Sequence, residues 1–202
     1  MLSTSKYLVI GASQEEYVIE GETIKSGFIQ VMNLERTNDG VIKGYQPMRI
    51  NLRNSALRIE DFSDAPGIYE IERRRTPKKK LGEKGYNLIP IRANLLKKIK
   101  FPEREEILLI GAKMVKMEQW KGLVTYLIDP MGEMEALSEK GKAYGYLAIE
   151  ETFEHWNFNN LQFIPGWYEA EFKSVRDTKG QEMERIADMN PIEQLNMADL
   201  AA

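Results

Sequence analysis

The chain has 202 residues, of which 43% are hydrophobic and 29% are charged, and its formal net charge is −3. This composition is typical of a globular protein and excludes wholesale disorder. No apolar run reaches about eighteen residues, so we expect no membrane-spanning segment. The chain has no cysteine, which excludes disulfides and zinc–thiolate sites, and its N-terminus lacks the pattern of a secretion signal. We therefore expect a soluble, cytoplasmic protein.

The two halves of the chain differ in charge. Residues 1–100 contain 18 Lys and Arg against 12 Asp and Glu, a net charge of +6, whereas residues 101–202 contain 10 against 19, a net charge of −9. Such asymmetry suggests that one half faces a polyanion and that the other half has a different role. Two solvated surfaces of unequal charge are the simpler alternative.

An internal repeat defines the predicted domain organisation. Three short segments recur in the same order at offsets of 100, 101 and 99 residues: 8–12 (LVIGA) with 108–112 (LLIGA), Gly44-Tyr45 with Gly145-Tyr146, and 66–70 (PGIYE) with 165–169 (PGWYE). Self-similarity of this kind indicates a duplicated unit. We predict a basic domain over residues 1–100, an acidic domain over residues 103–189, and an acidic, partly apolar tail over residues 190–202.

The first half reads mainly as strands, taken in chain order. Runs rich in β-branched and aromatic residues predict strands over residues 6–19, 23–34, 45–53, 67–72 and 86–92. In the third of these, hydrophobic and polar residues alternate, as a half-buried strand requires. Residues 55–65 are expected to form a turn or a short helix, and residues 94–99 a short helix at the end of the domain.

The second half repeats this order of elements. Strands are expected over residues 106–117, 123–129, 144–149, 167–176 and 181–187, with a helix over residues 151–157. Three strands, a short helix and two further strands is the order of the five-stranded OB-fold barrel. The predicted fold is therefore mainly β, with two tandem small OB-like β-barrel domains and short helices. A different small barrel or a β-sandwich is the alternative.

The first repeat contains a strongly basic segment between its last two predicted strands. Residues 73–85 (RRRTPKKKLGEKG) hold seven basic residues and one acidic residue, and we expect them to form a loop. The equivalent segment of the second repeat, residues 173–180 (KSVRDTKG), is short and of mixed charge. The longer basic version is therefore not needed to close the hairpin.

Clustered cations bind a phosphate chain by releasing its counterions, and bases stack on flat side chains. The sequence thus predicts a nucleic-acid site made of basic and aromatic residues: Arg73, Arg74, Arg75, Lys78, Lys79, Lys80, Lys84, Arg49, Arg53, Phe28, Tyr45 and Tyr86. A solvated hairpin tip, or an edge strand whose charges prevent aggregation, is the alternative for the cations. For the three aromatic residues, a place in the core or at its rim is the simpler alternative.

By its predicted strand order, its basic hairpin and its acidic, partly apolar end, the chain resembles the small OB-fold single-stranded DNA-binding proteins of phages and conjugative elements. The resemblance implies sequence-nonspecific binding of single-stranded DNA or RNA, in the host cytoplasm if the chain is encoded by a phage. It also implies a tail that recruits a protein partner, for which the candidate residues are Ile192, Leu195 and Leu200.

Few residues suit catalysis, so we expect no enzymatic activity, metal or cofactor. His155 is the only histidine, and the metalloprotease-like segment 151–155 (ETFEH) lacks the second histidine that such a site needs. Two other functions remain open. The chain is alternatively a structural or assembly protein of a phage or mobile element that self-associates through its oppositely charged halves, or an inhibitor whose acidic half imitates DNA.

Overall fold

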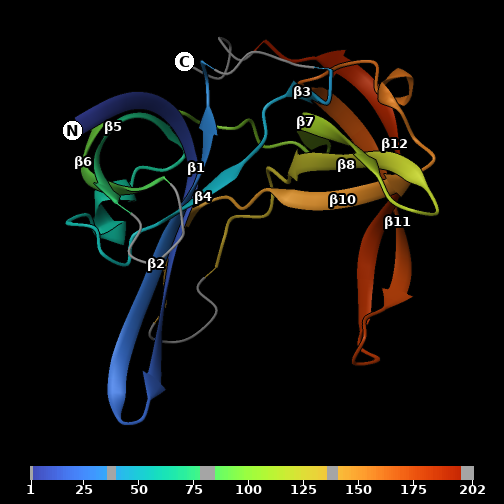
Figure 1. The fold of residues 1–202 in the computed structure, drawn as a ribbon. Helices are drawn as coiled ribbons and strands as arrows, with labels where there is room; N and C mark the ends of the chain where they lie inside the picture. Colours follow the sequence, from blue (N-terminus) through green and yellow to red (C-terminus); the bar gives the residue numbers. More distant parts are fainter. Residues whose placement is uncertain (1, 36–39, 78–84, 136–140, 197–202) are drawn as a thin grey trace.

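The computed structural model describes residues 2–35, 40–77, 85–135 and 141–196 (Figure 1). The described chain is mainly β, as predicted, and is organised as two antiparallel sheets with two short 3₁₀ helices. Within these ranges, none of the helices has the length and apolar character that crossing a membrane requires.

The first sheet is formed by the first half of the chain. Its strands lie in the spatial order β4 (Met48–Asn51), β2 (Glu22–Asn33), β1 (Leu2–Ile19), β5 (Gly67–Pro77) and β6 (Tyr86–Lys98). The 3₁₀ helix η1 (Ile59–Phe62) connects β4 with β5, and both Ile59 and Phe62 are buried.

The second sheet has the same order of equivalent strands. They are β10 (Ile149–Glu154), β8 (Lys121–Ile128), β7 (Ile107–Lys116), β11 (Gly166–Arg176) and β12 (Glu182–Gln194). The 3₁₀ helix η2 (Phe158–Asn160) connects β10 with β11. Figure 1 shows the long β1–β2 and β11–β12 hairpins projecting from the two halves.

The strand registers establish which positions of the two repeats correspond. The β1–β2 ladder shifts between Val9 and Gly11, and the β7–β8 ladder shifts between Leu109 and Gly111. The β5–β6 and β11–β12 ladders also shift at equivalent places, after Glu72 and after Glu171. The bulges are thus duplicated together with the strands, so residues can be compared between repeats one by one.

Each repeat contributes one short strand to the other repeat. Strand β3 (Ile42–Gly44) pairs with β7, and β9 (Lys142–Gly145) pairs with β1. The reciprocal exchange continues past the strands, because the Tyr45 N–H donates to the Ile110 carbonyl (2.9 Å) and the Tyr146 N–H donates to the Ile10 carbonyl (3.0 Å). The exchanged segments therefore join the repeats by backbone hydrogen bonds.

Glycine is required where the exchanged backbones meet. A Cβ atom on Gly11 would lie 2.2 Å from the Tyr146 carbonyl oxygen, and one on Gly111 would lie 2.2 Å from the Tyr45 carbonyl oxygen. No side chain fits at such a distance. The Gly-Ala and Gly-Tyr pairs of the sequence repeat therefore mark the two crossing points.

Three hydrophobic clusters form the core. One lies on the inner face of each sheet, around Val9 in the first repeat and Leu109 in the second. The third is shared: Leu8 and Ile10 of β1 pack with the equivalent residues of β7 and with Trp167. Both faces of β1 and β7 are thus covered along residues 8–12 and 108–112, which is why these repeated segments are continuously apolar.

Closed OB-like barrels are not confirmed, since the strand pairings among the described residues do not close either sheet. Each sheet nevertheless curls so that its two edge strands approach. The Ser55 hydroxyl after β4 donates to the Pro90 carbonyl of β6 (2.5 Å), and in the second repeat Arg185 of β12 pairs with Glu151 of β10. Side chains link the edges where backbone pairing does not.

Two predicted helices are wrong. Residues 151–154 belong to β10, in which the buried Glu151 and Phe153 alternate with the exposed Thr152 and Glu154, a period of two that the sequence reading mistook for a helix. Residues 94–98 likewise continue β6, because they pair with the start of β5. The predicted strand 45–53 is shorter, since β4 comprises only Met48–Asn51.

Candidate nucleic-acid interface

The β5–β6 hairpin carries the basic segment that the sequence singled out. Its ladder continues to the pair Pro77–Tyr86, so Arg73, Arg74 and Arg75 lie in strand β5. The prediction that these three residues belong to a loop is wrong. The strand extends this far because β1 begins at Leu2, which pairs with Arg74. The predicted contact residues Lys78, Lys79, Lys80 and Lys84 lie outside the described residues.

Arg73 faces the inner side of its sheet. Its guanidinium lies 5.2 Å from the centroid of the Tyr7 ring, and Nη2 donates a hydrogen bond to the Ser5 hydroxyl (3.1 Å). The side chain is half-buried. These contacts fix Arg73 against the end of the first repeat's inner core, so it is less accessible to a ligand than its two neighbours.

Arg74 and Arg75 are exposed, and Tyr86 at the end of the same ladder is 62% exposed. The registers align Arg73, Arg74 and Arg75 with Phe172, Lys173 and Ser174 of the second repeat. Strands β5 and β11 have the same length, 11 residues. The arginine run is therefore a property of the first repeat and not a requirement of the hairpin.

Phe28 and Arg49 lie together on the outer face of β2 and β4. The Arg49 guanidinium stacks over the Phe28 ring at 4.3 Å from its centroid. Further along this face the second repeat covers β2, because the Gln30 side-chain carbonyl accepts a hydrogen bond from the Ala148 N–H (2.6 Å) and Met32 is buried in the shared core. The accessible part of this face is thus the end that bears Phe28 and Arg49.

Tyr45 is placed differently from the other candidates. Its side chain packs against the shared core, and its backbone forms one of the crossing points between repeats. It therefore contributes to the joint between repeats rather than to an exposed stacking surface.

Arg53 follows β4 and is exposed. Although β2 and β1 separate β4 from β5 in the sheet, the curl brings the segment after β4 back towards β6. The Ser55–Pro90 hydrogen bond makes this contact, and Pro90 pairs with Arg73. The segment that follows Arg53 therefore contacts β6 of the basic hairpin.

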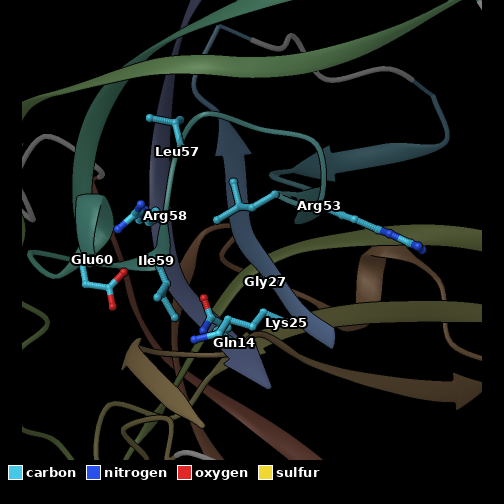
Figure 2. A pocket seen from close by; sticks show the side chains of 9 residues that line it. Gln14, Lys25, Gly27, Arg53, Leu57, Arg58, Ile59 and Glu60 are labelled. Atoms are coloured by element: carbon cyan, nitrogen blue, oxygen red, sulfur yellow. The ribbon is translucent and has the colours of Figure 1, made fainter. Parts of the chain in front are cut away.

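A cavity of about 440 Å³ lies beside Arg53, and sequence reasoning missed it (Figure 2). It lies between the β1–β2 hairpin and residues 52–60, with Lys25, Arg53, Arg58 and Glu60 among its lining residues. Lys25 pairs with Glu16 of β1 (2.5 Å). The one signal in the sequence was Gly27, which interrupts a strand rich in hydrophobic residues.

Glu60 at the cavity is held by the exchanged strand of the second repeat. Lys142 of β9 donates to the Glu60 carboxylate (2.5 Å), and this hydrogen bond lowers the pKa of Glu60 and raises that of Lys142. The carboxylate is therefore committed to a cation of the protein. Its charge opposes an incoming anion less than that of an unpaired carboxylate.

Two of the three tail candidates lie within the described residues. Ile192 lies in β12 and is 43% exposed, whereas Leu195 is buried in the shared core and its N–H donates to the Pro165 carbonyl (3.1 Å). Leu200 lies outside the described residues. Residues 192–194 thus end β12, and Leu195 is occupied by packing.

His155 is exposed in the turn after β10, where it adopts a positive φ of 66°. In the described ranges, the acidic and histidine side chains form no group of three or more that could hold a metal ion. Comparison of the chain with protein-family models, with curated proteins and with solved structures gives no match. Inferences about function therefore rest on the geometry described above.

Proposed function

We propose that this protein binds single-stranded DNA without sequence specificity and that it has no enzymatic activity. The observation that carries the proposal is the β5–β6 hairpin, on which the exposed Arg74 and Arg75 precede a lysine-rich segment and Tyr86 is exposed at the end of the ladder. The second repeat has Lys173 and Ser174 at the positions of the two arginines.

Two kinds of contact are combined on this surface. Arginine and lysine neutralise phosphates and release counterions, which provides affinity irrespective of sequence. Exposed aromatic rings provide stacking surfaces for unpaired bases, a contact that every base can make. Tyr86 offers such a ring on the hairpin, and the Phe28–Arg49 stack offers a second flat surface at the accessible end of β2 and β4.

The topology also supports the proposal. In the order β4-β2-β1-β5-β6, the third and fifth strands of the repeat (β4 and β6) are the two edges, as in a five-stranded Greek-key barrel that is open between them. OB-folds bind oligonucleotides on the face of strands 2 and 3 and through the loops between strands 1 and 2 and strands 4 and 5. Phe28 and Arg49 correspond to that face, and the basic hairpin corresponds to the second loop.

The proposed interface belongs to the first repeat alone. At the position of Arg53 the second repeat has Glu154, and across its β11–β12 hairpin Glu171 faces Asp188, where the first repeat pairs Glu72 with Arg92. Like charges directly opposite each other are unfavourable in a ladder, so this acidic face favours a cationic neighbour. That observation supports self-association with a basic first repeat as a second candidate function.

The test is the salt dependence of binding to a labelled oligothymidylate of about 16 nucleotides, measured by fluorescence anisotropy. The variant Arg74→Gln/Arg75→Gln should bind more weakly, and its plot of log K against log salt should be shallower by about 1.4, because each lost phosphate contact changes the slope by about 0.7. The matched control is Lys173→Gln/Arg176→Gln, which removes two cations from the equivalent strand β11.

The proposal is wrong if the Arg74/Arg75 variant retains both the affinity and the salt slope of the wild-type protein. Light scattering of the wild-type protein without nucleic acid distinguishes the second candidate function. Large assemblies that dissolve with added salt would support self-association, whereas a constant particle size would exclude it.

A further inference from the structure

The cavity beside Arg53 has the size of a small-molecule site. Its volume of about 440 Å³ lies in the range of roughly 300–1,000 Å³ that such sites occupy. Leu52, Leu57 and Ile59 give it an apolar floor, while Gln14 and Lys25 lie on the side of the β1–β2 hairpin. Figure 2 shows Gln14, Lys25 and Ile59 close together and Arg53 extending away from them.

The cavity exists because position 27 is a glycine. Gly27 pairs with Gln14 in the first repeat, and Leu123 pairs with Met114 in the second. The registers therefore place Gly27 and Leu123 at equivalent positions. Leu123 is fully buried in the core of the second repeat, so the same fold accommodates a large side chain at this position. A Cβ atom on Gly27 would make only ordinary contacts of 3.7 Å. Neither strain nor crowding explains the glycine, and its effect is to leave the space open.

The residues around this position differ in the second repeat, where a cavity of about 340 Å³ is lined in part by Phe153, Glu154 and Trp156. Leu52 aligns with Phe153, whose ring stacks on Trp156 at 4.2 Å between centroids. Arg53 aligns with Glu154, so the charge at the rim is reversed. The two repeats thus share a backbone but differ here in both volume and charge.

The rim of the cavity is basic. Its charged lining residues are Lys25, Arg53, Arg58 and Glu60, of which Lys25 is paired with Glu16 and Glu60 with Lys142. The excess positive charge is therefore that of Arg53 and Arg58. The cavity lined by Pro66, Ile99 and Phe101 lacks this excess. In that cavity Lys100 lies with two carboxylates, Glu103 and Glu133. An apolar floor with a cationic rim suits a ligand that combines a flat apolar ring with an anionic group.

We infer that this cavity is a subsite for one nucleotide of the bound strand. The base lies against the apolar floor, within reach of the Gln14 amide, and the phosphate lies at the rim beside Arg53. From there the strand leads towards β6 of the basic hairpin, which the segment after Arg53 contacts. This inference rests on the proposed function. It adds a site for one base and its phosphate to the phosphate contacts that the hairpin provides.

The test uses the full chain and thymidine 5′-monophosphate as the probe, with thymidine and inorganic phosphate as the two partial ligands. NMR titration should show saturable shifts at the amides of Gly27, Leu52 and Ile59 with the nucleotide, and at least tenfold weaker binding of either partial ligand. The variant Gly27→Leu fills the cavity with the residue that the second repeat uses. We expect it to weaken nucleotide binding at least tenfold while the protein remains folded.

The control is Thr23→Leu, which places the same side chain on an exposed position of β2 away from the cavity and should bind as the wild-type protein does. The oligothymidylate assay then separates the two proposals. Gly27→Leu should weaken strand binding about tenfold without changing the salt slope, because it removes a base contact and no phosphate contact.

If the wild-type protein binds oligothymidylate and Gly27→Leu binds both the nucleotide and oligothymidylate equally well, the subsite is wrong and the proposed function still holds. Failure of the wild-type protein to bind oligothymidylate overturns the proposed function. Nucleotide shifts that map to the hairpin rather than to the cavity also overturn the subsite.

Discussion

The substitution Gly111→Ala tests whether the exchanged strands hold the two repeats together. The new Cβ atom would lie 2.2 Å from the carbonyl oxygen and 2.6 Å from the nitrogen of Tyr45. Both are backbone atoms, so β3 must move by roughly 1 Å or more to restore van der Waals distances. That movement breaks the hydrogen bond from the Tyr45 N–H to the Ile110 carbonyl.

The expected cost follows from these two effects. Overpacking costs about 1–3 kcal/mol and the lost buried hydrogen bond about 1 kcal/mol, so the free energy of unfolding should fall by roughly 2–4 kcal/mol. For a chain of this length, Tm should fall by about 4–16 °C. Urea denaturation followed by tryptophan fluorescence is the appropriate assay, because Trp167 is buried in the shared core and reports on the joint.

The control for this experiment is Gly40→Ala. A Cβ atom at Gly40 meets no other atom within 4 Å, so the free energy of unfolding should stay within about 0.5 kcal/mol of the wild-type value. If Gly111→Ala changes stability as little as Gly40→Ala does, the crossing points are not tightly constrained. The account of the joint between repeats would then be wrong.

Two further predictions concern buried polar groups. Burial raises the pKa of Tyr69 to about 12, so the folded state retains this proton where the unfolded state, with a pKa of about 10, loses it. Stability should therefore fall between about pH 10 and 12, and Tyr69→Phe should flatten this part of the profile in urea denaturation; equal slopes would contradict the prediction. Arg185→Ala removes the partner of the buried Glu151 and should cost about 1–3 kcal/mol. Adding Glu151→Ile, which installs the residue of the equivalent Ile50, should recover most of that loss, and no recovery would show that the pair matters for another reason.

The sequence was sufficient for the features that depend on local pattern. The duplicated segments predict a duplicated unit, and the content of Val, Ile, Tyr and Phe predicts most of the strands. The strand expected over residues 144–149 is wrong, because residues 146–148 separate β9, which ends at Gly145, from β10, which begins at Ile149. The alternation of Arg49, Ile50 and Asn51 correctly predicts which side of β4 is exposed. The helix expected over residues 151–157 failed because Glu151 is a charged residue in a buried position, and only its partner Arg185, far along the chain, makes that position tolerable.

The features that depend on contacts between repeats could not be read from the sequence. Three-residue β3 has no strand signature, and it forms because Ile110 and Gly111 of the other repeat offer backbone partners. The cavity was also missed, because its signal is the difference between Gly27 and Leu123. That difference becomes meaningful only when the registers establish that the two residues occupy equivalent positions.

A duplicated chain separates what the fold needs from what one copy does. Where the backbones cross, both repeats have glycine, as at Gly11 and Gly111, because the geometry allows nothing larger. Where they differ at equivalent positions around the cavity, the fold evidently tolerates either residue, as the pairs Gly27/Leu123 and Arg53/Glu154 demonstrate. The open volume and the cationic rim of the first repeat therefore have no structural necessity. A ligand that combines a flat ring with negative charge provides a physical reason for both.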